Sequence, residues 1–225
     1  MYFDSSILIL LPAVLFALWA QSRVKSTYAR YSKEFASLTG AEAARMVLEM
    51  NGVTGVAIEQ VAGELTDHFD PKTNTIRLSQ GVCNVTSVAA VGVAAHEAGH
   101  AVQYAKGYSP IKIRTAIIPV TQIGSSLSWP LLLIGILLGS ETLAMAGVLL
   151  FGAVVLFQLV TLPVEFNASN RALDALSASG YLQPEQVNGA AKVLRAAAMT
   201  YVAALAQAIS QLLRLMLIAN RSRRD

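Results

Sequence analysis

The chain has 225 residues, of which 54% are hydrophobic and 14% charged, and its formal net charge at pH 7 is +3. A mean hydropathy of +0.51 is too high for an ordinary soluble domain and indicates membrane-spanning segments. The length excludes two full globular domains in addition to such segments. The single cysteine excludes an internal disulfide and is typical of a reducing compartment.

The first apolar stretch runs from about residue 7 to residue 20, which is short beside the ~20 residues of a typical span. A cleavable signal peptide would need a basic region before it and a small-residue cleavage site after it. The first Lys or Arg is Arg23, and no such site follows the apolar core. We therefore expect residues 1–22 to form an uncleaved N-terminal transmembrane anchor.

Residues 23–116 form a small soluble module in this interpretation. Thr39 and Glu42 have the spacing of a capping box and open a helix that Asn51 and Gly52 stop. Three short β-type runs follow, over residues 55–61, 64–69 and 75–79. Turn signals separate the three runs, and the last two alternate well enough to predict an antiparallel hairpin.

The last of these runs is our expected edge of the sheet. A peptide substrate can add to an exposed edge through backbone hydrogen bonds, which positions a scissile bond without demanding a sequence. The residues of this expected substrate edge are Ile76, Arg77, Leu78 and Ser79. An ordinary protected strand is an equally good interpretation of the same residues.

The run His96-Glu97-Ala98-Gly99-His100 matches the pattern HExxH. It lies in an Ala- and Val-rich segment that predicts a helix over about 87–105, capped by Asn84 or Thr86. Histidines at i and i+4 lie on one face of a helix, where both imidazoles can bind one Zn²⁺. Glu97 is then placed as a general base. Two buried, hydrogen-bonded histidines with an exposed glutamate are the structural alternative.

Two longer apolar stretches, 117–138 and 142–164, are separated only by Gly139-Ser140-Glu141 and predict a transmembrane helical hairpin. Pro130 and the cluster Gly124-Ser125-Ser126 predict that the first arm is kinked or closely packed.

The placement of Lys and Arg orients these segments. Arg23, Lys25, Arg30 and Lys33 follow the first span, whereas Lys106, Lys112 and Arg114 precede the second. By the positive-inside rule, residues 21–115 lie in the cytoplasm, and the N-terminus and the hairpin tip lie outside. The HExxH motif therefore faces the cytoplasm.

The fourth apolar stretch, 196–219, does not fit this scheme as simply. If it spanned, the terminal Arg221, Arg223 and Arg224 would lie outside, and Arg214 would cost ~2.5–3.5 kcal/mol near the bilayer centre. Its polar residues recur along one helical stripe, which is typical of a helix at the interface or packed on a domain. A fourth span stays open as the alternative.

A catalytic zinc site needs three protein ligands and one open position. His68 is the third histidine of the chain, in a turn-rich segment. Glu165 follows the third apolar stretch, at a depth where an ionisable group is costly unless it has a partner. Two histidines and one glutamate are a well-attested hydrolytic set, which favours Glu165 over His68.

The chain resembles the YugP-like membrane zinc metallopeptidases and, more distantly, the HtpX-type gluzincins. The matching segments are Trp19-Ala20-Gln21, Val24-Lys25-Ser26, Leu65 to Pro71, His96 to His100, Leu162 to Ser169, and Leu194 to Val202. The resemblance implies that Glu165 is the third zinc ligand. Ser169 stands where the HtpX-type pattern has an aspartate, so Ser169, Asn167 or Asp174 would orient a zinc histidine instead.

The function expected from these features is zinc-dependent hydrolysis of peptide bonds, with Glu97 as the base. His68 and Tyr201 are the candidates for stabilising the oxyanion, although a turn histidine and an interfacial aromatic are the structural alternatives. Two other functions compete. One is an intramembrane metalloprotease of the site-2 type, with Asp174 in its second motif, and the other is a non-catalytic scaffold with structural zinc.

The predicted fold is an α+β membrane protein, mostly α, with a zincin-like minimal domain of a small sheet and the HExxH helix. Its parts are an anchor (1–22), the module (23–116), the hairpin (117–164) and a helical segment (165–225) that carries the third ligand and an apolar or amphipathic helix. We expect one Zn²⁺ per chain, a multi-pass location in the plasma membrane, and a peptide or protein substrate, with no nucleic acid.

Overall fold

The computed structural model describes residues 5–222, which are mostly helical with one three-stranded sheet. The ends of the first and last predicted parts, 1–4 and 223–225, lie outside the described residues, and with them Arg223 and Arg224. The chain divides into two compact units. We call them the helical unit (Met1–Ala20, Lys112–Leu162, Met199–Asp225) and the mixed unit (Gln21–Ile111, Pro163–Ala198).

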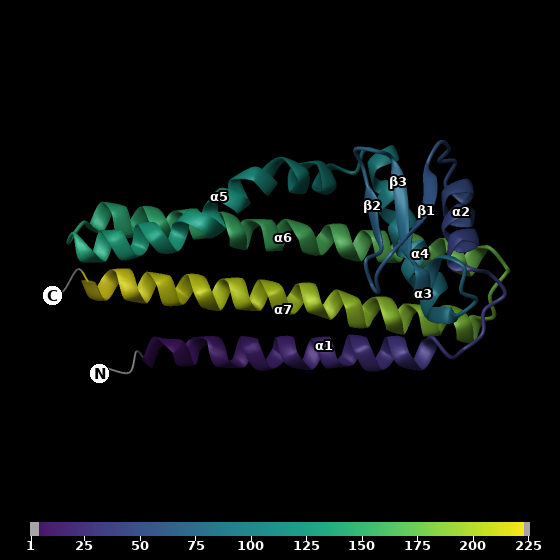
Figure 1. Cartoon of the computed structure of the whole chain (residues 1–225), viewed down its shortest axis with the longest axis horizontal. Helices are drawn as coiled ribbons and strands as arrows, with labels where there is room; N and C mark the ends of the chain where they lie inside the picture. The colour runs from purple at the N-terminus through teal and green to yellow at the C-terminus, as the bar shows by residue number, and fades with distance from the viewer. Residues whose placement is uncertain (1–4, 223–225) are drawn as a thin grey trace. The chain divides into compact units, whose positions relative to one another are not determined.

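Four helices among the described residues are long and apolar enough to cross a membrane. They are α1 (Leu11–Tyr31, preceded by the 3-10 helix η1, Ser5–Leu10), α5 (Ser109–Leu137), α6 (Glu141–Ala178) and α7 (Pro184–Ser222) (Figure 1). Each of the four has residues in both units. All three predicted spans are confirmed as long apolar helices. The fourth apolar stretch, 196–219, lies within α7, which is also long and apolar enough to span.

Helices α5 and α6 form the predicted hairpin, joined by a turn at residues 138–140. Gly135 lies against the backbone of Ala144, and Gly147 lies against the backbone of Ser128, so closely that a Cβ atom would collide at either position. Small residues at such crossings let helices pack by backbone contact in a membrane. An apolar cluster joins α7 to the two arms; its buried members are Leu132, Ala144, Val148, Leu215 and Ala219.

In the mixed unit, α2 (Gly40–Met50) begins at the predicted capping box. The Thr39 hydroxyl accepts a hydrogen bond from the Glu42 amide at 3.2 Å, and the Glu42 carboxylate accepts one from the Thr39 amide at 2.7 Å. The helix ends at Asn51, and Gly52 follows with a positive φ. Its apolar face packs against α4 (Val88–Ala105), the helix that carries HExxH.

The residue predicted to cap the N-terminus of α4 is wrong, because the observed cap lies one to three positions later in the chain. Neither Asn84 nor Thr86 caps the helix; the Ser87 hydroxyl accepts the hydrogen bond from the Ala90 amide at 3.2 Å. The short helix α3 (Gln80–Cys83) ends at Asn84, so that residue belongs to the preceding element. Small side chains fill most of α4, and most of them are fully buried in the core of the mixed unit.

The sheet has the order β1–β3–β2, which contradicts the predicted substrate edge. Strands β2 (His68–Asp70) and β3 (Thr75–Ser79) pair antiparallel, as predicted, but β1 (Ala57–Val61) pairs parallel to β3 on its other side. The central strand therefore contains Ile76, Arg77, Leu78 and Ser79. It is not a free edge, because β1 pairs with residues 75–79 on one side and β2 with residues 75–77 on the other.

Burial explains why β3 is central. Ile76 and Leu78 are fully buried, whereas the residues of β1 are largely exposed or partly exposed. The Asp67 carboxylate, in the loop before β2, accepts hydrogen bonds from the backbone amide of Ser79 at 2.7 Å and from its hydroxyl at 3.1 Å. This contact fixes the loop that leads from β1 to β2 against the end of β3.

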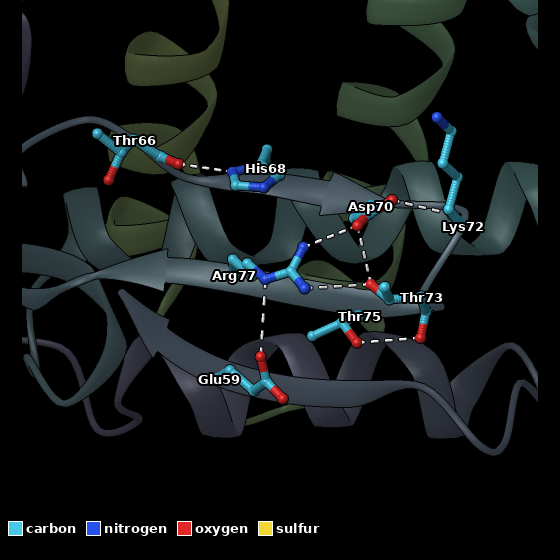
Figure 2. A network of polar contacts seen from close by, with 8 residues as sticks. All are labelled: Glu59, Thr66, His68, Asp70, Lys72, Thr73, Thr75 and Arg77. Atoms are coloured by element: carbon cyan, nitrogen blue, oxygen red, sulfur yellow. Dashed lines mark hydrogen bonds and ion pairs between the residues drawn. The ribbon is translucent and has the colours of Figure 1, made fainter. Parts of the chain in front are cut away.

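A polar network covers the other face of the sheet (Figure 2). Arg77 on β3 donates to the Asp70 carboxylate on β2 at 2.8 Å and lies 3.6 Å from the Glu59 carboxylate on β1. The hydrogen bond from Arg77, with those from the Lys72 amide and the Thr73 hydroxyl, holds the pKa of Asp70 well below its usual range. One arginine thus links all three strands.

Candidate metal centre

Two helices of the mixed unit bring three metal-ligating side chains together. His96 and His100 lie one turn apart on α4, and their rings meet edge to face with centroids 4.7 Å apart. Glu165 lies in the middle of α6, and its Oε2 atom is 3.3 Å from His96 Nε2 and 3.5 Å from His100 Nε2. All three are largely buried, with Glu165 only 3% exposed. No other group of this kind occurs among the described residues.

The donor set fits a zinc ion. Ligand atoms bound ~2.0–2.1 Å from a tetrahedral Zn²⁺ lie about 3.3–3.4 Å from one another. The two nitrogen-to-oxygen separations of 3.3 and 3.5 Å match that value, and all three ligand atoms lie within 4.8 Å of one another. Three such ligands leave one coordination position open, which is the arrangement of catalytic zinc sites rather than structural ones.

Gly99 is the reason that α6 comes close enough to supply a ligand. A Cβ atom at this position would collide with the backbone carbonyl of Ala168 on α6. Glu165 is one helical turn before Ala168, so the contact at Gly99 brings its carboxylate level with the two histidines. The second variable position of HExxH is therefore set by packing between the two helices.

The Nδ1 atoms of both histidines have hydrogen-bond partners on the side away from Glu165. His96 Nδ1 lies 3.1 Å from the Ser169 hydroxyl, and His100 Nδ1 lies 3.0 Å from Gln103 Oε1. Asn167 accepts a hydrogen bond from Gln103 Nε2 at 3.0 Å. Ser169 and Asn167, both named from the sequence, are thus beside the ligands, whereas Asp174 is exposed on α6 and contacts none of them.

Sequence reasoning missed Gln103 and Arg171, which donates to Asn167 at 2.8 Å. The spacing offered a signal for Gln103, since a residue three positions after His100 lies on the same face of a helix. Arg171 had no comparable signal, because its part depends on how α6 is docked.

Nearby carboxylates shape the electrostatics of the site. Burial lowers the pKa of the His100 imidazole, but Glu165 and Glu97 outweigh burial, and the net pKa is raised above 6.5. Metal binding must therefore displace a proton when His100 is charged. Glu97 is partly buried and follows His96 on α4.

His68 and Tyr201, the two residues named for the oxyanion, are not members of this cluster. His68 is exposed on β2, and its Nδ1 atom pairs with the Thr66 carbonyl at 2.8 Å (Figure 2). Strand β2 packs against α4 through Phe69 and Tyr104, whose ring centroids are 5.5 Å apart. Tyr201 lies on α7 in the helical unit.

Long apolar helices and a buried His–His–Glu cluster together define a membrane protein with a site that can hold a metal ion. A family model described as "Putative neutral zinc metallopeptidase" matches residues 6–220, and the chain belongs to this family. It is 45% identical over 214 residues to "Putative membrane protease YugP" of Bacillus subtilis (strain 168), covering 94% of this chain and 95% of that protein. No solved structure matches the chain. The predicted resemblance to the YugP-like membrane zinc metallopeptidases is confirmed.

Proposed function

We propose that the chain is a membrane-anchored zinc endopeptidase of the gluzincin type, which hydrolyses peptide bonds at the cytoplasmic face of the plasma membrane. The convergence of His96, His100 and Glu165 at zinc-ligand separations carries the proposal. Membership of a zinc metallopeptidase family supports it. The open fourth position favours a catalytic site over a structural one.

The HExxH helix favours hydrolysis beside the membrane over hydrolysis within it. Helix α4 is not among the four helices of residues 5–222 that are long and apolar enough to span, and it is packed in the core of the mixed unit. An intramembrane protease of the site-2 type would need the motif inside a span. This observation supports the membrane-surface mechanism.

When held by His96, His100 and Glu165, zinc would supply a Lewis acid that polarises the scissile carbonyl and lowers the pKa of a water molecule. Glu97 accepts a proton from the attacking water and passes it to the leaving amine. The Ser169 and Gln103 contacts hold the two imidazoles so that their Nε2 atoms face Glu165. His68 and Tyr201 stay our proposals for stabilising the oxyanion.

Metal analysis and proteolysis of the full chain in detergent test this function. We expect one zinc per chain in the wild type and in Glu97→Gln, and loss of zinc in Glu165→Ala. Cleavage of casein should fall by roughly 10²–10⁴-fold in Glu97→Gln, the usual contribution of a general base, and should vanish in Glu165→Ala.

Glu49→Gln is the matched control, because Glu49 is exposed on α2 and touches none of the ligands. It should keep both zinc and activity. Full zinc content together with unchanged cleavage in Glu97→Gln would contradict the proposed mechanism. Zinc binding that survives Glu165→Ala but not Asp174→Ala would favour the site-2 alternative.

A further inference from the structure

Gln103 is a fully buried glutamine that joins the motif helix to α6. Its side chain makes three hydrogen bonds: Oε1 to His100 Nδ1 at 3.0 Å, and Nε2 to the Val164 carbonyl at 2.8 Å and to Asn167 Oδ1 at 3.0 Å. Val164 immediately precedes the ligand Glu165. One amide group therefore contacts one zinc histidine and the backbone beside the third ligand.

The partners of this amide determine which way it points. A backbone carbonyl can only accept, so the group that faces Val164 must be the NH₂ end of Gln103. The contact with Asn167 requires the same orientation. The Arg171 guanidinium can only donate, so the Asn167 atom that faces it is the acceptor Oδ1, and the Gln103 atom that faces this oxygen must be a donor. Both hydrogens of Nε2 are thereby used, and the oxygen of Gln103 is left to face His100.

The orientation of Gln103 in turn determines the tautomer of His100. An amide oxygen can only accept, so the Nδ1 atom that faces it must carry the hydrogen. In the neutral imidazole the lone pair then lies on Nε2, the atom 3.5 Å from Glu165 Oε2. His96 has a weaker constraint, since the Ser169 hydroxyl can either donate or accept.

We propose that Gln103 is the positioning residue for zinc at His100, and that Arg171 and Asn167 hold it in the one orientation that presents the Nε2 lone pair to the metal. The inference rests on the proposed zinc site. It adds a directional chain from Arg171 through Asn167 and Gln103 to His100, which neither the motif nor the family description contains. Partners of this kind typically change metal affinity by about 10–100-fold.

The zinc dissociation constant of the full chain in detergent, measured by competition with a chromophoric chelator, tests the chain of contacts. Gln103→Leu keeps the volume and removes all three hydrogen bonds, so zinc binding should weaken by about 10–100-fold. Asn167→Leu should also weaken it, whereas Asn167→Asp should stay near wild type, because an aspartate oxygen still accepts from Gln103 and Arg171. Arg171→Met should weaken it less than Gln103→Leu does.

Ser87→Ala is the matched control on the same helix. It removes the cap of α4 far from the ligands and should lower the melting temperature without changing zinc affinity. Ring-nitrogen NMR of zinc-free protein gives a second measurement. At a pH where His100 is neutral, the wild type should keep the proton on Nδ1, and Gln103→Leu should show a mixture of tautomers.

Zinc binding by Gln103→Leu as tight as that of Ser87→Ala would overturn the inference while leaving the proposed function intact, provided that Glu165→Ala loses zinc. Equal losses in Asn167→Asp and Asn167→Leu would also overturn it, because a mere packing role would not distinguish an acceptor oxygen from a methyl group. A wild-type chain that binds no zinc would overturn both proposals.

Discussion

Gly99 shows how a single position can limit the geometry of a two-helix metal site. Its missing side chain leaves room for the Ala168 backbone, and the α6 ligand reaches the α4 ligands only because of that contact. In Gly99→Ala the helices must separate, since the colliding atoms are backbone and cannot rotate away. We expect a loss of about 1–3 kcal/mol in stability, typical of overpacking, and weaker zinc binding.

Gly92→Ala provides the comparison on the same helix. A Cβ atom there would lie 3.3 Å from the Ala190 Cβ, so the neighbouring helix must shift by only a few tenths of an ångström, and Gly→Ala gains up to ~1 kcal/mol of helix propensity. Zinc content and melting temperature should therefore change little. Equal zinc loss in the two variants would show that α4 tolerates no added volume anywhere, and would remove the special role of Gly99.

The residues of the site differ in how far the sequence could predict them. His96 and His100 follow from spacing alone, because a helix places i and i+4 on one face. Glu165 follows from the cost of a carboxylate at membrane depth, which demands a partner. Gln103 could be found from its spacing to His100, but its contacts with α6, like the contact of Arg171 with Asn167, arise only when α6 docks on α4.

At the scale of the elements, the ion pairs of Arg77 with Asp70 and Glu59 connect the three strands of the sheet. Asp70 has its pKa held below the usual value of about 4 by Arg77, the Lys72 amide and the Thr73 hydroxyl. A carboxyl with a depressed folded-state pKa contributes stability that is complete above its unfolded pKa. That contribution is lost as the pH falls through the unfolded value toward the folded one.

Asp70→Asn should therefore lower the melting temperature of the detergent-solubilised chain at neutral pH. The gap from wild type should narrow steadily as the pH falls below about 4, because the wild-type carboxyl becomes protonated too. Asp174→Asn, which removes an exposed carboxylate from α6, is the control variant. A gap between Asp70→Asn and wild type that stays constant from pH 7 to pH 3 would contradict the role given to the network.

Strand β3 marks the limit of element-level prediction. Alternation of apolar and polar residues correctly indicated the strand and its antiparallel pairing, both local properties, but the partner strand is residues 68–70 and not the predicted 64–69. The parallel pairing with β1 is a longer-range choice, made because burying Ile76 and Leu78 requires cover on both sides of the strand. No pattern within the run 76–79 distinguishes an edge from a centre.

At the scale of the whole molecule, the division into units agrees with the order of the predicted spans. The mixed unit combines Gln21–Ile111 with Pro163–Ala198, and the hairpin lies between these two segments in the chain. A hairpin that crosses a membrane and returns brings its flanks to the same side. The mixed unit is therefore built from segments that the positive-inside rule assigns to the cytoplasm.

Whether α7 crosses the membrane is a test of this topology, because charge and packing give different expectations for the side on which its C-terminal end lies. Arg221 argues against an outside C-terminus. Against that, residues 199–222 would extend about 36 Å as a helix, enough for the ~30 Å hydrocarbon core, and α7 packs with the hairpin in one apolar cluster. The Arg214 guanidinium lies over the Trp129 ring of α5 at 5.6 Å, a cation–π contact that offsets part of the cost of a charge within the span.

Single-cysteine labelling of intact cells decides whether α7 is a fourth span or a helix at the cytoplasmic interface. In a Cys83→Ala background, a membrane-impermeant thiol reagent should label Ser140→Cys in the hairpin turn from outside. It should label Lys72→Cys in the β2–β3 turn only after permeabilisation. We expect Asn220→Cys to behave like Ser140→Cys, because packing with the hairpin arms leaves α7 the length and the apolar face of a fourth span. Labelling of Asn220→Cys only after permeabilisation would instead place the end of α7 in the cytoplasm, as expected for a helix lying at the interface.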